Sequence, residues 1–195
     1  MEEKEIQPAE SLALINGMIN TAKNRIADDG FLLIFWGWNV LLAALIHYAC
    51  LRAGVANGHL SWIVMMPIGG AVSLVYGLRQ RKKDRVTTYV DAYLGYSWGG
   101  FIIGMFIALA FMPYHGMKTT YFFLMVLYGL ATFISGGLLR FKPLIVGSLV
   151  SFLFAIVSVF AGEADQLLCV AAAILGSYVI PGHLLRIRYR SQNNV

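Results

Sequence analysis

Five side chains in this sequence place a polar group or a helix-breaking ring inside or at the edge of an otherwise apolar segment. They are Asn39, Asp91, Ser177, Pro181 and His183. An amide, a carboxyl group, a hydroxyl, an imidazole and a carbonyl freed by proline are groups with which a membrane protein can bind a solute or relay a proton. The residue types therefore define a candidate intramembrane polar site.

Each of the five also has a structural interpretation, which the sequence favours. Asn39 lies nine residues into its segment, roughly 13–14 Å at 1.5 Å per residue, where an amide can hydrogen-bond another helix. Asp91 can cap a helix or pair with nearby basic residues. Pro181 frees the carbonyl of Ser177 and fits either a tolerated kink or, together with His183, a cavity in a discontinuous helix.

Enzyme and metal motifs are missing from the sequence. It has no His-Glu-x-x-His or Gly-x-Ser-x-Gly motif, no phosphate-binding loop, and four histidines without ligand spacing. We therefore expect neither catalysis nor a bound cofactor or metal, although an outer metal or proton site built from histidines stays open. Two cysteines exclude a zinc cluster. Whether Cys50 and Cys169 pair is also open.

The placement of the charged residues predicts the architecture. Six stretches of 20 residues or more contain no Asp, Glu, Lys or Arg, and a membrane-spanning helix needs about 20 predominantly apolar residues. We expect an all-α bundle of six transmembrane helices over residues 30–190, followed by a tail over 191–195. The predicted spans are about 30–51, 60–78, 89–112, 119–139, 143–162 and 166–186.

The basic residues predict the orientation of the chain. With six spans, 13 of the 15 Lys and Arg residues fall on the side of the termini, and only Arg52 and Lys118 on the other. This asymmetry predicts a cytoplasmic-membrane protein with both termini in the cytoplasm. One basic run should contact anionic lipid headgroups rather than nucleic acid: Arg79, Arg81, Lys82, Lys83 and Arg85.

Residues 1–29 form a predicted amphipathic leader helix. Their apolar residues recur at spacings of three and four along one stripe: Leu12, Ile15, Ile19, Ala22 and Ile26. The leader is expected to lie on the bilayer or under the bundle. The alternative is a docking helix for a cytoplasmic partner.

Segments of similar sequence indicate a repeated hairpin. Residues 134–142 resemble residues 180–188, and Asp29, Trp36 and Gly37 match Asp91, Trp98 and Gly99. We expect three parallel hairpins. Small residues at spacings of four should let the helices approach closely, and an unused ridge on the third span is the candidate for homodimerisation.

The Gly-rich span ends in residues 133–143 and 180–186, with the Asp29-Gly30-Phe31 and Trp36-Gly37-Trp38 stretches, resemble a group of uncharacterised bacterial six-span inner-membrane proteins. The repeated hairpins are also loosely similar to acid-resistance membrane proteins of the HdeD type. The resemblance implies architecture and carries no catalytic residue. We expect a non-enzymatic envelope-stress accessory or a regulatory or binding protein of the membrane. The alternative is a small-solute or proton-coupled transporter.

Overall fold

The computed structural model describes residues 17, 30–83 and 89–193. Within this part of the chain the fold is all-helical, with no strand. It contains six helices long and apolar enough to cross a membrane, as the sequence predicts. The amphipathic leader, apart from Gly17, lies outside the described residues, as does Arg85.

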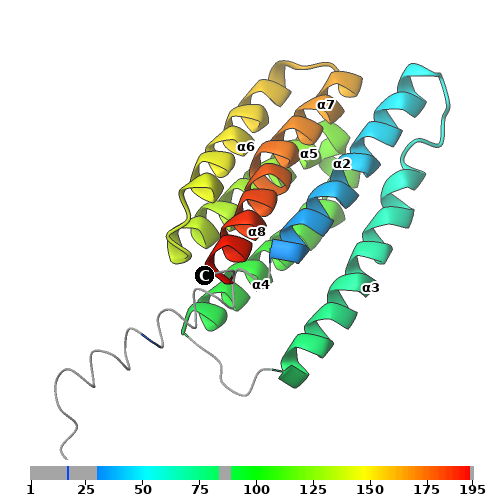
Figure 1. The fold of residues 1–195 in the computed structure, drawn as a ribbon. Coiled ribbons are helices and arrows are strands. Elements are labelled where there is room, and N and C mark those ends of the chain that lie inside the picture. The colour runs from blue at the N-terminus through cyan, green and yellow to red at the C-terminus, as the bar shows by residue number, and fades with distance from the viewer. Residues whose placement is uncertain (1–16, 18–29, 84–88, 194–195) are drawn as a thin grey trace, which may run out of the picture.

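Each of the first five spans lies in one helical element, α5 with an interruption near its start, and the sixth span has three parts (Figure 1). The bounds are α2 Gly30–Arg52, α3 Leu60–Lys83, α4 Tyr89–Ala110, α5 Met112–Leu138 and α6 Lys142–Phe160. The last span comprises α7 Glu163–Ile174, the π-helical turn η1 Leu175–Val179 and α8 Ile180–Asn193.

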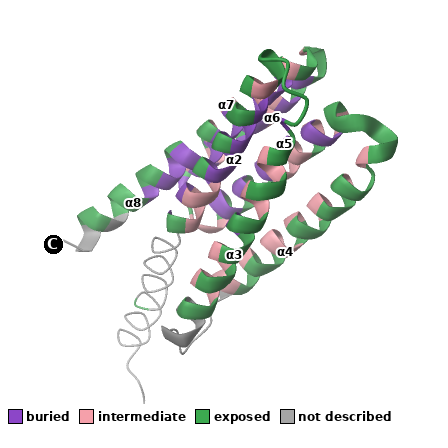
Figure 2. Ribbon diagram, turned by 90° about the vertical axis from the view of Figure 1, so that its right-hand side faces the viewer, coloured by how far each residue is buried: buried purple, intermediate pink, exposed green. Residues whose placement is uncertain are grey.

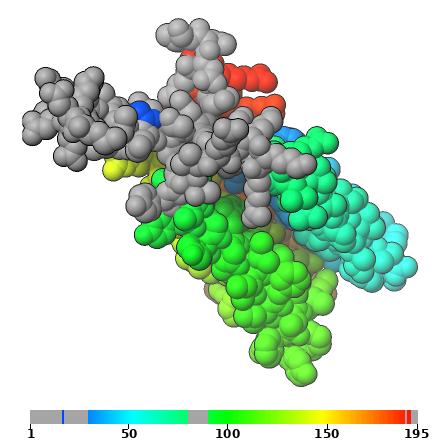
Figure 3. Space-filling model, turned by 90° about the horizontal axis from the view of Figure 1, so that it is seen from below, coloured from blue at the N-terminus to red at the C-terminus, as the bar shows by residue number. Residues whose placement is uncertain are grey.

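The packed core is made by four of the six spans. The buried side chains lie mainly on α2, α5, α6 and the α7–η1–α8 span (Figure 2). In contrast, α3 packs against α2, and α4 packs mainly against α5. Only 6% of the apolar window of α3, and 6% of that of α4, is buried inside the protein. These two helices are therefore peripheral, and they stand forward in the space-filling view (α3 cyan, α4 green; Figure 3).

Glycines allow the core helices to approach at backbone distance. A Cβ on Gly37 of α2 would lie 2.8 Å from Val179, and one on Gly129 of α5 would lie 2.5 Å from Phe152 of α6. At Gly147 of α6 the neighbour is the Gly176 carbonyl oxygen. Lipid provides no hydrophobic drive between helices, so such close contacts supply the association energy.

Hydroxyl side chains add bonds within and between these helices. Ser151 Oγ of α6 donates to the Met125 carbonyl of α5 at 2.9 Å, and both residues are fully buried. Thr132 and Ser135 instead donate to carbonyls of their own helix. These bonds satisfy polar groups that lipid could not.

The helix α5 begins at Met112, earlier than the sequence predicts. A short helical piece precedes the predicted span, and one non-helical residue joins the two. Gly116 has φ 78° and ψ 166°, which interrupts helical backbone between a short N-terminal piece and the long part of the helix. Positive φ is readily adopted by glycine. Pro113 starts the short piece, where the missing N–H costs nothing.

Candidate functional site

Asn39 lies in the contact between α2 and α3. Its side chain is 6% exposed, and Nδ2 donates to the Met65 carbonyl of α3 at 2.9 Å. About one turn earlier in α2, Trp36 Nε1 donates to Ser73 Oγ of α3 at 2.8 Å. Gly69 makes room for both, since a Cβ there would lie 2.9 Å from Asn39 Nδ2. The amide thus serves as an interhelical link.

Ser177 and Pro181 are buried where the last span faces α6. Ser177 Oγ donates to the Ala173 carbonyl at 2.6 Å, and Ile180 N–H bonds the Leu175 carbonyl in the π-helical turn. The chain accommodates Pro181 by widening the helix rather than by breaking it. The contact with Gly147 is close, with Pro181 Cγ 3.0 Å from where a Cβ would be placed.

The remaining two candidates lie elsewhere. His183 is exposed on α8, where Trp38 Nε1 is 3.5 Å from its Nε2. Asp91 is half-buried in the first turn of α4. The five residues therefore occupy separate places: the α2–α3 contact, the η1–α6 contact, the α8 surface and the start of α4. They form no single cluster.

An aromatic cluster that the sequence did not indicate joins α4 and α5 to the π-helical turn. Tyr178 makes edge contacts with Tyr128 and Trp98, with ring centroids 5.4 and 6.1 Å apart. Phe101 adds a contact with Tyr128 at 5.0 Å. Aromatic pairs prefer edge-on arrangements at 4.5–7 Å. Aromatic contacts thus connect α4 both to α5 and to the π-helical turn.

Two hydroxyls at this attachment are buried without a hydrogen-bond partner among the described residues. They are Ser97 Oγ of α4 and Tyr178 OH, whose residue is 2% exposed. A buried polar group without a partner costs about 1–3 kcal/mol. The contact between α4 and the core therefore leaves two buried hydroxyl groups without a described hydrogen bond.

We expect Tyr178→Phe to stabilise the isolated protein by about 1 kcal/mol, because it removes an unpaired buried hydroxyl. The matched control is Tyr121→Phe, which removes a hydroxyl 3.3 Å from His47 Nδ1 and should destabilise. Thermal unfolding in one detergent compares the two variants. A larger loss for Tyr178→Phe than for Tyr121→Phe would show that the Tyr178 hydroxyl is bound in the folded protein.

A polar cluster lies at the opposite end of the bundle from the termini. Trp62 Nε1 of α3 donates to Nδ1 of His47 of α2 at 3.0 Å, and Tyr121 of α5 approaches the same nitrogen. An indole N–H only donates, so Nδ1 carries no proton and His47 is neutral in this arrangement. His47 therefore ties three helices together.

Neither metal ligation nor a disulfide is built from the candidate residues. No group of three or more His, Cys, Asp or Glu side chains that could hold a metal occurs in the described part of the chain. Cys50 and Cys169 are free thiols, half-buried and buried respectively. His59 and His115 are exposed.

The peripheral helix α4 presents an open surface of small residues. At Gly95, Gly99 and Gly100, no described atom outside the helix's own backbone lies within 4 Å of an added Cβ. Ile103 continues this face one turn further along and is 63% exposed. The small residues of α6 and η1, by contrast, are all used inside the bundle.

No family model, curated protein or solved structure matches this chain.

Proposed function

We propose that this protein is a non-enzymatic binding or regulatory protein of the cytoplasmic membrane, of the envelope-stress accessory kind, which binds a partner transmembrane helix along α4. The observation that carries the proposal is the open face of Gly95, Gly99 and Gly100 on a helix that is hardly buried. Small residues in a membrane helix allow the backbone of another helix to approach closely, whereas contact with lipid chains does not require them.

The way α4 is attached supports the same proposal. It rests on α5 and on aromatic edges, and it leaves the hydroxyls of Ser97 and Tyr178 unpaired. A helix held in this way can shift against the core at low cost, which suits an element that responds to a partner. The transporter alternative has less support, because Asn39 and Ser177 are each engaged in a helix contact or within their own helix.

The finer points of the architecture belong to this proposal. Both termini lie in the cytoplasm, and the basic run from Arg79 to Arg85 contacts anionic headgroups. The leader helix lies against the bilayer or a cytoplasmic partner, and three hairpins repeat along the chain. The partner of α4 is either a second copy of this chain or another membrane protein.

Photo-crosslinking tests the proposal. A crosslinking amino acid at Ile103 of α4 is compared with one at Ile156 of α6, which is matched in exposure at 59% against 63%. We expect protein adducts of discrete mass from Ile103 and only lipid adducts from Ile156. An adduct of twice the 21.6 kDa chain mass identifies a second copy.

The variant Gly99→Leu should reduce the Ile103 adducts at least fivefold, because its side chain fills the open face and its Cβ meets no described atom within 4 Å. The control is Gly137→Leu on α5, which also has no described neighbour within 4 Å. Equal lipid-only labelling at both isoleucines, or no effect of Gly99→Leu, would exclude the proposed surface.

A further inference from the structure

Two hollows flank the first turns of the long part of α5. One, of about 280 Å³, lies between α4 and α5 and reaches from Phe111 and His115 down to Gly104 and Leu127. The other, of about 330 Å³, is lined by Lys118, Thr119, Phe122 and Val159 of α5 and α6. Both hollows include Thr119 as a lining residue.

The first hollow is about as deep as one lipid leaflet and, like a leaflet, is polar at its outer end and apolar further in. On α5 the lining runs from Thr119 to Leu127, eight residues further along, about 12 Å of helix, and one leaflet contributes about half of the ~30 Å hydrocarbon core. The polar residues of the lining, His115, Thr119 and Thr120, lie at the end of the bundle. Deeper residues are apolar. A polar end above an apolar channel is complementary to an amphiphile.

The narrow shape favours a slender occupant over a helix. A volume of about 280 Å³ spread over that depth is too slender for a helix 10–12 Å across. An acyl chain, which is a flexible single file of methylenes, fits it. The small residues Gly104 and Ala108 leave this space on the α4 side.

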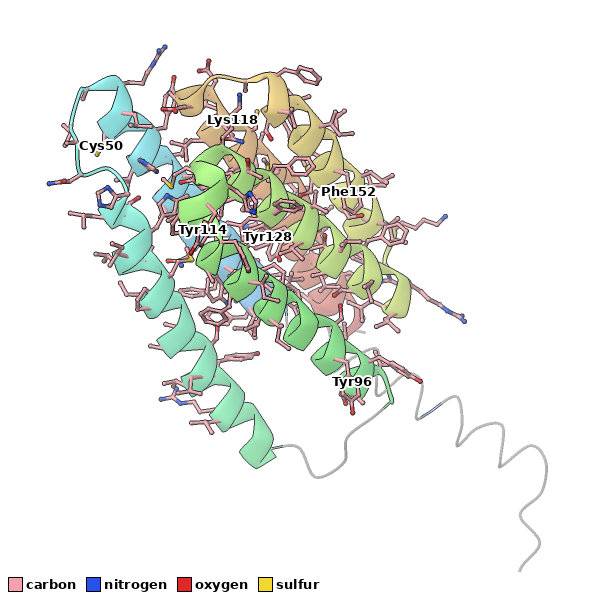
Figure 4. All side chains as sticks on the ribbon, turned by 180° about the vertical axis from the view of Figure 1, so that it is seen from behind. Cys50, Tyr96, Tyr114, Lys118, Tyr128 and Phe152 are labelled. Atoms are coloured by element: carbon pink, nitrogen blue, oxygen red, sulfur yellow. The ribbon has the colours of Figure 1, made fainter. Side chains whose placement is uncertain are left out.

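A cation lines the second hollow, next in sequence to the Thr119 that both hollows share. Lys118 is exposed at the rim of the second hollow, at the same end of the bundle as Cys50 and far from Tyr96 (Figure 4). Its backbone is fixed, because Gln166 Nε2 of α7 donates to the Lys118 carbonyl at 2.7 Å and Gln166 is 2% exposed. The charge is thus presented from a held position at headgroup level.

We propose that Lys118 and the two hollows bind one anionic diacyl phospholipid from the leaflet at this end of the bundle. The phosphate lies against Lys118 at the rim of the second hollow, and one acyl chain runs down the first hollow. A cation next to the polar end of an apolar channel is complementary to an amphiphile with a charged phosphate and an acyl chain. The first hollow adjoins the open face of α4, because Gly104 and Ile107 follow Gly100 and Ile103 by one helical turn. The basic run lies at the other end of the bundle.

Lipid retention measured by native mass spectrometry tests the site. The purified full chain is exchanged from detergent into micelles containing dioleoyl phosphatidylglycerol or dioleoyl phosphatidylcholine. We expect one phosphatidylglycerol molecule to be retained about fivefold more tightly than phosphatidylcholine, as one basic residue contributes about 1 kcal/mol near a membrane surface. Soluble glycerol phosphate should not compete, since it fills neither hollow.

Two variants separate the parts of the site. Lys118→Ala should abolish the fivefold preference, whereas Arg52→Ala, the other basic residue at this end, should leave it within about twofold. Ala108→Phe narrows the first hollow and should weaken retention of both lipids. The proposal is overturned if Lys118→Ala and Arg52→Ala behave alike, if Ala108→Phe has no effect, or if glycerol phosphate displaces the lipid.

Discussion

Replacing Gly147 by alanine is expected to destabilise the folded protein by about 3 kcal/mol, more than a glycine-to-alanine change at any other described glycine. The new Cβ would meet the Gly176 carbonyl oxygen and would lie 2.9 Å from Ser177 Cα. Both atoms belong to the backbone of the π-helical turn, so neither can move aside as a side chain could. Separating α6 from η1 would also open the contact with Pro181.

The control is Gly70→Ala on α3, where no described neighbour lies within 4 Å of the added Cβ. Alanine is a better helix former than glycine by about 1 kcal/mol, so this variant should be neutral or slightly stabilised. Thermal unfolding of both proteins in the same detergent gives the comparison. Similar midpoints for the two variants would mean that α6 and η1 are not packed at backbone distance.

Replacing His47 by phenylalanine is expected to cost about 2–3 kcal/mol and to loosen the end of the bundle opposite the termini. The change removes the acceptor of the Trp62 indole N–H and the neighbour of the Tyr121 hydroxyl, leaving two polar groups without partners. Gly58 packs against both His47 and Cys50, so the α2–α3 connection should open as well.

Unfolding midpoint and maleimide reactivity of the half-buried Cys50 measure this effect. His47→Asn should recover part of the stability, because the asparagine oxygen can accept near the position of Nδ1. His59→Phe, at an exposed neighbouring histidine, should change neither quantity. If His47→Phe and His59→Phe were equally stable, the three-helix junction would not depend on the imidazole.

Much of the architecture follows from the sequence because the bilayer imposes simple rules. Charges are excluded from spans, and a span has a minimum length, so the uncharged stretches indicate six apolar helices. The six helices are present in the structure. The sequence does not show that α3 and α4 lie outside the core, because every span is apolar on all sides and hydrophobicity cannot separate a lipid-facing surface from a packed one.

The candidate site was less accessible to sequence reasoning. Polarity singled out Asn39 and Ser177, yet both bond to backbone carbonyls. Tyr178 and Ser97 were missed because their importance lies in the absence of a partner, which depends on how helices pack. The spacing of Gly95 and Gly99 was visible, but only the structure distinguishes this open face from the packed ridge that includes Gly147.

The functional proposals all depend on six helices crossing the membrane, with α3 and α4 facing lipid. Cysteine-accessibility labelling tests this claim most directly, in a background with Cys50 and Cys169 replaced by alanine. A cysteine at Glu163, where α7 begins, should react with a membrane-impermeant maleimide in intact cells. A cysteine at Lys82, near the end of α3, should react only after permeabilisation. Labelling of both positions from the same side would contradict the six-span arrangement and the surfaces assigned to it.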